Sequence, residues 1–168
     1  MYDLDSLNWR TQILTKSLKE YALVAEVIGA IAVVISLIYV GASVNQNTNA
    51  IMVANHHALV AMDQNTNGWF RDSEFAATFE IAMEDASTLS PVQSRQFRVF
   101  LADKFNAWEF AFLTHNSGMM EDNIWDGWDA YYRSELEQQG HQWYWTAGKE
   151  GFSPAFRMYV DSILAEIE

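Results

Sequence analysis

Apolar residues dominate the stretch from Ala22 to Val44, and the 18 residues from Val27 to Val44 include no charged side chain. A helix rises 1.5 Å per residue, so this run would span about 27 Å, close to the roughly 30 Å hydrocarbon core of a bilayer. The pattern therefore predicts one membrane-spanning helix over residues 22–44. Two alternatives stay open. One is a buried core helix of a soluble protein, and the other is a cleaved signal peptide, whose apolar run is usually shorter, about 7–15 residues.

The segments on either side of the predicted span also read as helical. Residues 1–21 place leucines at helical spacing, which is typical of an amphipathic helix on a membrane surface or of a short soluble lead-in helix. Residues 45–67 are rich in amides and contain no Gly or Pro, so we expect the spanning helix to continue through them. A heptad-like seam follows Val44, Thr48, Ile51, Asn55, Ala58 and Met62. Because the seam is short for a coiled coil, we expect it to pack on the chain's own domain rather than on a second copy.

The remainder of the chain shows helical periodicity throughout. Ser90, Pro91 and Gln93 form the clearest start signal, a capping box with proline in the first turn, and that helix can run to His115. Further helices are predicted from Asp72 or Ser73, over 121–139 with Gly140 as its end, in a short turn at 141–145, and after Ser153-Pro154. We therefore predict an all-α protein in which a helical bundle domain occupies residues 45–168, with the apolar helix 91–115 at its centre.

Charge narrows the possible partners. Residues 45–168 carry seven Lys and Arg against eighteen Asp and Glu, a net charge of −11. A surface this acidic repels nucleic acid and anionic lipid, so we expect no nucleic-acid binding. The chain contains no Cys, which removes disulfides, thiolate catalysis and thiolate metal ligands together.

The sequence offers little catalytic chemistry. The sequence has no glycine-rich phosphate loop, no nucleophile elbow and no His-Glu-x-x-His, and no His stands three residues after a Glu as di-iron bundles require. His56 and His57 are adjacent, so on a helix they point about 100° apart and do not chelate one ion. We expect no cofactor, no metal and no enzymatic activity.

Two features are candidates for other roles. Glu109 adjoins Trp108 in the most apolar helix, and we expect it to be partly buried and paired with Arg98, Lys104 or Arg133. A dense aromatic set forms the second feature, and it is either bundle core or a partner surface. Its members are Trp125, Trp128, Tyr131, Tyr132, Trp143 and Trp145.

Several motifs carry a family resemblance. They are Ile31–Val40 with Gln46-Asn47-Thr48, Leu89-Ser90-Pro91, Trp125 with Trp128, Phe152–Arg157, and Tyr159-Val160-Asp161. With them, the chain resembles a widespread family of small, uncharacterised bacterial proteins that have one N-terminal membrane helix and an all-helical domain. The resemblance covers most of residues 25–165. It implies this architecture and a bacterial inner-membrane location, but no activity.

Two observations favour opposite orientations of the chain in the membrane. Arg10, Lys16 and Lys19 precede the span, and the next basic residue after it is Arg71, so the positive-inside rule places the bundle outside the cytoplasm. Members of the resembled family often carry Arg just after the span, where this chain has Val44 and Asn45. Those arginines would place the domain in the cytoplasm.

An anchor, an acidic aromatic-rich domain and the lack of a catalytic motif favour a non-enzymatic interaction role. We expect an accessory or scaffold subunit of a membrane assembly, with the lipid bilayer and a membrane protein, or a second copy of the chain, as partners. A small-molecule or signal-sensing domain is the first alternative, because an apolar pocket between Trp-rich helices would suit a ligand. An enzyme of unknown class is the second.

Overall fold

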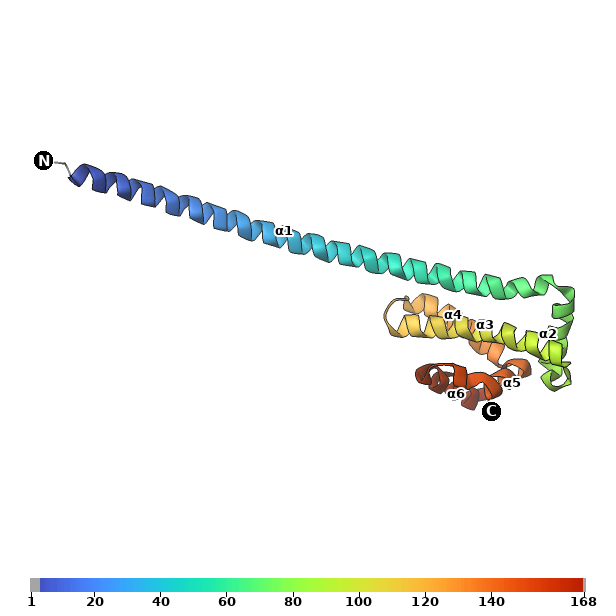
Figure 1. The fold of residues 1–168 in the computed structure, drawn as a ribbon. Coiled ribbons are helices and arrows are strands. Elements are labelled where there is room, and N and C mark those ends of the chain that lie inside the picture. The colour runs from blue at the N-terminus through green and yellow to red at the C-terminus, as the bar shows by residue number, and fades with distance from the viewer. Residues whose placement is uncertain (1–3, 168) are drawn as a thin grey trace. The chain divides into compact units, whose positions relative to one another are not determined.

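The computed structural model describes the backbone of residues 4–167 and the side chains of residues 18–167. Over that range the chain is helical and contains no strand, which confirms the all-α prediction (Figure 1). The α-helices are α1 (Leu4–Asn67), α2 (Ser73–Asp85), α3 (Pro91–Asn116), α4 (Asp122–Leu136), α5 (Gln139–Gly148) and α6 (Pro154–Ile167). Short 3₁₀ segments η1 (Gly68–Arg71), η2 (Ala86–Thr88) and η3 (Lys149–Gly151) join them.

The chain divides into two compact units, residues 1–47 and residues 48–168, and α1 contributes to both. The expected amphipathic face of residues 1–21 lies mostly outside the described side chains. The expected continuation of the helix to Asn67 is confirmed.

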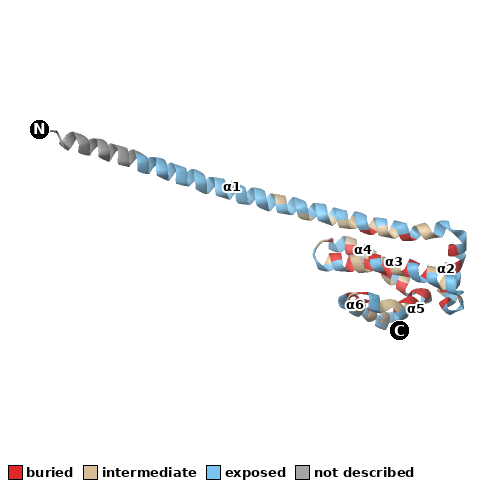
Figure 2. Ribbon diagram, viewed as in Figure 1, coloured by how far each residue is buried: buried red, intermediate tan, exposed pale blue. Residues whose placement is uncertain are grey.

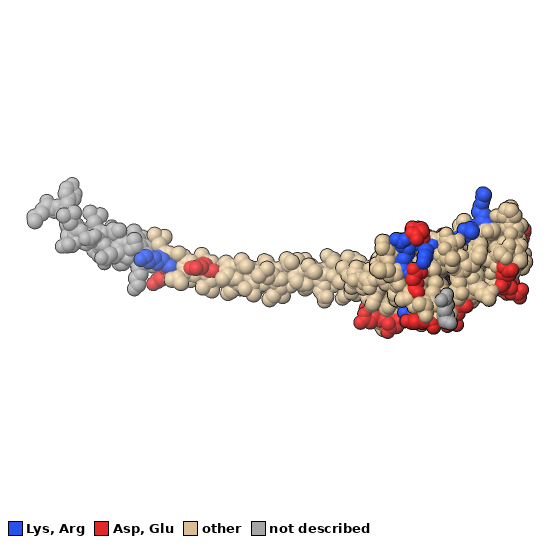
Figure 3. Space-filling model, turned by 90° about the horizontal axis from the view of Figure 1, so that it is seen from below, with Lys and Arg blue, Asp and Glu red and all other residues tan. Residues whose placement is uncertain are grey.

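The first unit presents an exposed apolar helix. Every residue from Leu18 to Ala42 is exposed (Figure 2). The most apolar 18-residue stretch of this helix has a mean hydropathy of 2.6, and 0% of it is buried. Helix α1 is therefore long and apolar enough to cross a membrane. After Lys19, Glu20 and Glu26 this surface carries no charge, as the uniformly tan stretch in Figure 3 shows. Because no part of that stretch is buried, the alternative of a soluble core helix finds no support.

The second unit is a bundle built around α3. The fully buried side chains of α3 include Phe97, Phe100, Leu101 and Trp108. Helices α2, α4, α5 and α6 surround α3, and Leu59 enters the core from α1. The central position expected for the helix 91–115 is therefore observed.

Local capping explains where these helices begin. The Asp72 side chain accepts a hydrogen bond from Glu74 N at the start of α2. Ser90 and Gln93 form the reciprocal capping box at the start of α3, with Pro91 in its first turn. Each cap satisfies backbone N–H groups that a helix N-terminus leaves without an intrahelical partner.

The prediction that Gly140 ends the helix over 121–139 is wrong. Gly140 lies inside α5 instead of ending the preceding helix, which stops at Leu136. A Cβ on Gly140 would stand 2.9 Å from the Ala82 carbonyl oxygen and 2.9 Å from Met83 Cε. The glycine is therefore needed for the close approach of α5 to α2, and not for a left-handed helix stop.

The packing face of α1 in the bundle is also offset from the predicted seam. Ile51 and Ala58 are exposed, whereas Leu59 and Thr66 are each 0% exposed. The expected packing on the chain's own domain is present, because the Asn55 side chain donates to the Met119 carbonyl at 3.1 Å and Leu59 enters the core. Asn55 and Met62 of the seam take part in this packing, and Leu59 and Thr66 are buried beside them in place of Ile51 and Ala58.

Candidate functional site

A buried lysine is the centre of the polar interior. Lys104 projects from α3 and is 4% exposed. Its Nζ donates to Asp63 Oδ1 of α1 at 3.0 Å and to the hydroxyl of Tyr131 on α4. Burial alone would lower the pKa of this ammonium, but the contacts with Tyr131 and Asp63 outweigh burial and raise the pKa above its ordinary value. Lys104 is therefore charged at neutral pH and joins three helices.

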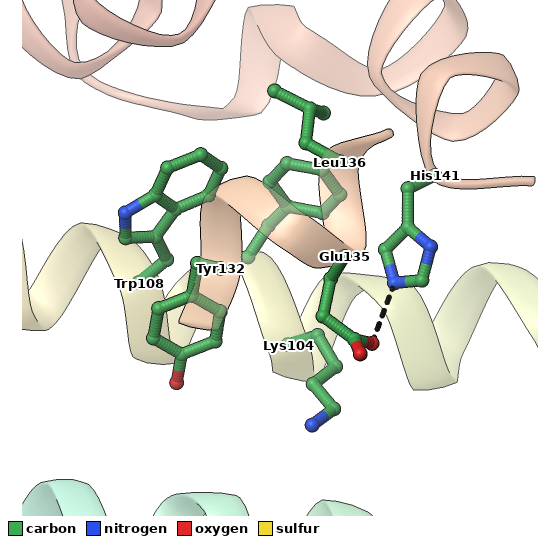
Figure 4. Close-up of a pocket in the computed structure, with 7 residues that line it drawn as sticks. Lys104, Trp108, Tyr132, Glu135, Leu136 and His141 are labelled. Carbon is green, nitrogen blue, oxygen red and sulfur yellow. Dashed lines mark ion pairs between the residues drawn. The ribbon is translucent and has the colours of Figure 1, made fainter. Parts of the chain in front are cut away.

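A histidine and a glutamate lie beside this lysine. His141 of α5 is 2% exposed, and its Nε2 is 3.5 Å from Glu135 Oε2 of α4, the contact dashed in Figure 4. Burial and the nearby Lys104 charge lower the pKa of His141 to about 4. Burial also raises the pKa of Glu135. At neutral pH the imidazole is uncharged, so the 3.5 Å contact is not an ion pair.

These side chains enclose a cavity. Figure 4 shows Lys104, Trp108, Tyr132, Glu135, Leu136 and His141 around it, and Phe105 completes the lining. Its volume is about 10 Å³, close to the space that one water molecule needs. Both ring nitrogens of His141 and the Tyr132 hydroxyl lack a hydrogen-bond partner within the described residues. One water could serve such groups, but a substrate does not fit.

A second buried network adjoins the first through Trp108, which also lines the cavity. Asp129 of α4 is 9% exposed and accepts from Trp108 Nε1 at 3.2 Å. It also accepts from Arg133 Nε at 2.7 Å and from the Tyr159 hydroxyl of α6. Burial acts to lower the Arg133 pKa, but the contacts with Asp129 and Tyr159 raise it overall. This network joins α3, α4 and α6 with its polar atoms paired, which is a structural role.

A groove runs between the bundle portion of α1 and α4. Two adjoining hollows of about 470 Å³ and about 360 Å³ share His56 and Ile124 in their linings. The first is also lined by Asp63, Asn67, Gly127, Trp128 and Tyr131, and the second by Asn49, Met52, Val53 and Glu121. Trp128 and Tyr131 are half-buried, so each keeps part of its ring in the groove.

None of the protein-family models, curated proteins or solved structures compared with this chain matches it.

The predicted aromatic set is split between core and surface. Trp125, Tyr132 and Trp145 are buried, and their rings pack against other aromatic side chains of the bundle. The other three members are half-buried: Trp128 and Tyr131 line the groove, and Trp143 lies beneath the guanidinium of Arg98 at 4.6 Å. The part of this set that a partner could reach is therefore Trp128, Tyr131 and Trp143.

The expected ion pair of Glu109 is replaced by another contact. Glu109 is half-buried, and its Oε1 accepts from the backbone N–H of Ser153 at 2.7 Å, just before α6 begins. The cations offered to it are engaged elsewhere: Lys104 binds Asp63, and Arg133 binds Asp129. Within residues 18–167, Glu109 forms no ion pair. It holds the start of α6 instead.

The sequence analysis did not predict the pairing of Lys104 with Asp63 or the burial of Asp129 and His141, although the positions of Lys104 and Asp129 indicate that both are buried. Lys104 stands on the apolar face of α3, four residues before Trp108, where a lone charge requires a partner. Asp129 stands four residues after Trp125 on the inward face of α4. His141 left no such signal, because its helix is short. Among the described residues, no three His, Asp or Glu side chains gather closely enough to hold a metal ion.

Proposed function

We propose that this chain is a membrane-anchored, non-enzymatic interaction protein, an accessory or scaffold subunit whose acidic bundle contacts a protein partner. The observation that carries the proposal is the pairing of an exposed, uncharged apolar helix with a bundle whose buried charges bind one another. An apolar helix without a covering surface requires lipid or protein around it. Charges already paired inside a core serve packing rather than chemistry.

The test is purification from native bacterial membranes of the full tagged chain, with mass spectrometry of what accompanies it. A matched control is the same tag on residues 1–47, which keeps the anchor and lacks the bundle. A protein that accompanies the full chain reproducibly and not the control supports the role. A strictly monomeric chain that retains no protein reproducibly would refute it.

We infer a bacterial inner-membrane location with the bundle outside the cytoplasm, on the strength of the three basic residues before the span. The chain is free of Cys, so a single cysteine can report the side. Ser117→Cys, in an exposed turn of the bundle, should react with a membrane-impermeant maleimide in intact spheroplasts. Ser6→Cys, before the span, should react only after lysis. The reverse labelling pattern would place the bundle in the cytoplasm, as the family resemblance implies.

Ligand sensing is the alternative that a specific observation favours. The groove of about 470 Å³ falls within the usual range for small-molecule sites, roughly 300–1,000 Å³. Its wide exposure to solvent and flanking carboxylates suit a protein segment better than a small apolar ligand. A metabolite that raises the bundle's melting temperature in a thermal-shift screen would favour sensing. An enzymatic role has less support, because the recorded partner of Glu109 is a backbone amide and not a histidine.

A further inference from the structure

The groove between α1 and α4 is apolar at its base. Ile124 and Trp128 supply apolar surface from α4, and Met52 and Val53 supply it from α1. Gly127 lies in the same lining, and a Cβ at that position would meet no atom within 4 Å. The groove therefore offers apolar surface and open space.

The charged part of the lining is of one sign. Asp63 and Glu121 contribute carboxylates, and among the described residues no Lys or Arg side chain lines either hollow. The Asp63 charge is already paired with the buried Lys104, so the carboxylate open to a partner is that of Glu121, which is exposed. The surrounding domain carries a net charge of −11 over residues 45–168. A cationic segment would be attracted to this groove, and a second acidic bundle would be repelled.

We propose that this groove docks a helical segment of a protein partner, whose apolar strip is flanked by Lys or Arg. The inference rests on the proposed function and gives it a site and a partner chemistry. The lining of α1 runs from Asn49 to Asn67, and the 18 helical steps between these two residues extend about 27 Å. That length matches four to five turns of a docked helix, which would place side chains at i, i+3, i+4 and i+7 over the aromatic base.

Competing occupants fit less well. A second copy would bring another strongly acidic bundle against the carboxylates. Anionic lipid headgroups would meet the same repulsion. The chain's own basic residues, Arg10, Lys16 and Lys19, precede the predicted span and so lie on the opposite side of the membrane under the proposed function.

Gly127→Leu is the variant that blocks the groove. The added side chain enters open space, and glycine is among the weakest helix formers, so the substitution leaves α4 intact while filling the site. Ala130→Leu is the matched control, because Ala130 is exposed on the same helix and lines neither hollow. Glu121→Gln removes one flanking charge, and Glu137→Gln removes an exposed charge beyond the other end of α4.

The probe is a fluorescent peptide of about four helical turns with a Leu and Trp strip flanked by Lys. Its twin has Glu in place of every Lys. Binding is measured by fluorescence anisotropy to the full chain in zwitterionic phosphatidylcholine nanodiscs, and empty nanodiscs give the lipid background. We expect the Lys peptide to bind the chain above that background and the Glu twin to bind at least about tenfold more weakly.

Gly127→Leu should weaken binding of the Lys peptide at least about tenfold, which is the loss expected when one apolar anchor is displaced. Ala130→Leu should change the affinity less than about twofold. Glu121→Gln should weaken binding about two- to fivefold and Glu137→Gln should leave it unchanged within error. Equal binding of the two peptides, binding only to lipid, or full binding by Gly127→Leu overturns the proposal. Self-association that Gly127→Leu abolishes overturns it in favour of a second copy.

Purification from native membranes separates this proposal from the proposed function. A partner that accompanies the wild type and Ala130→Leu but is lost from Gly127→Leu supports the groove. A partner retained by Gly127→Leu overturns the groove and leaves the interaction role standing. If no partner accompanies any chain while the Lys peptide still binds as expected, the groove chemistry is supported and the proposed function fails.

Discussion

Replacing Lys104 with Met should destabilise the bundle substantially. The ammonium is 4% exposed and lies 3.0 Å from Asp63 Oδ1. At an effective dielectric constant near 20, two charges at that separation attract by about 5 kcal/mol, before the cost of desolvating both is subtracted. Removal of the lysine leaves the Asp63 side chain, which is 16% exposed, without its cation. Breaking a buried pair costs about 3–5 kcal/mol, and the residual exposure of Asp63 places the expected loss at about 3 kcal/mol.

The assay is urea unfolding of the full chain in detergent, followed by tryptophan fluorescence at neutral pH. Lys104→Met should lower the free energy of unfolding, and so should Asp63→Leu, which leaves a buried ammonium. The double variant should lie within about 2 kcal/mol of the wild type, because matched apolar replacements remove the desolvation cost together. Lys149→Met is the control. Its pair with Asp161 has side-chain exposures of 36% and 43%, so its loss should stay below about 1 kcal/mol.

The pH dependence supplies a further check on the same pair. The Lys104 pKa is raised in the folded state above its ordinary value of 10.5. The folded state therefore holds this proton more tightly, and the stabilisation is complete below that value and is lost as pH rises through the folded pKa. The difference in the free energy of unfolding between the wild type and Lys104→Met should stay constant from neutral pH to about 9. It should narrow above pH 10.5. A loss under about 1 kcal/mol for Lys104→Met, or strict additivity in the double variant, would refute the reasoning.

Three further outcomes are expected from the same unfolding assay. His141 has a folded pKa of about 4 against an ordinary 6.5, so unfolded chains bind its proton first and the bundle should lose about 2 kcal/mol between pH 7.5 and 5. His141→Leu should remove that loss, and an unchanged acid slope in this variant would contradict the assignment. Gly140→Ala should destabilise by about 1–3 kcal/mol because its Cβ meets the α2 backbone, whereas Gly127→Ala, which meets nothing, should stabilise by about 0.5–1 kcal/mol. Ser90→Ala should cost about 1 kcal/mol through loss of the capping box, with Ser134→Ala on an exposed face of α4 as its neutral control.

Features set by neighbouring residues were predictable from the sequence. The start of α3 depends on Ser90, Pro91 and Gln93, all within one turn, and the helix begins where they place it. The apolar run before Val44 depends on composition alone. The central position of α3 followed from its wide apolar face. In each case the deciding interactions lie within about one or two helical turns.

Features set by distant residues were not predictable. Gly140 looks like a helix stop because its neighbours do not reveal the Ala82 carbonyl against which it packs. The burial of Leu59 instead of Ala58 depends on which rotation of the amide-rich part of α1 best covers α3. Lys104 and Asp63 are separated by 41 positions, so their pairing appears only after the helices assemble.

The two buried polar networks fix how the helices of the bundle are rotated against one another. Apolar contacts are non-directional, and helices rich in Phe and Trp could pack in several rotations at similar cost. The pairing of Asp63 with Lys104 at 3.0 Å fixes the rotation of the final turns of α1. The hydrogen bond from Tyr159 to Asp129 fixes the rotation of α6. A rotation that separates either pair would leave a buried charge without its partner, at a cost of several kcal/mol. We therefore expect the Lys104→Met/Asp63→Leu double variant, although folded, to show broader amide resonances than the wild type at α1, because what it loses is uniqueness of packing rather than stability.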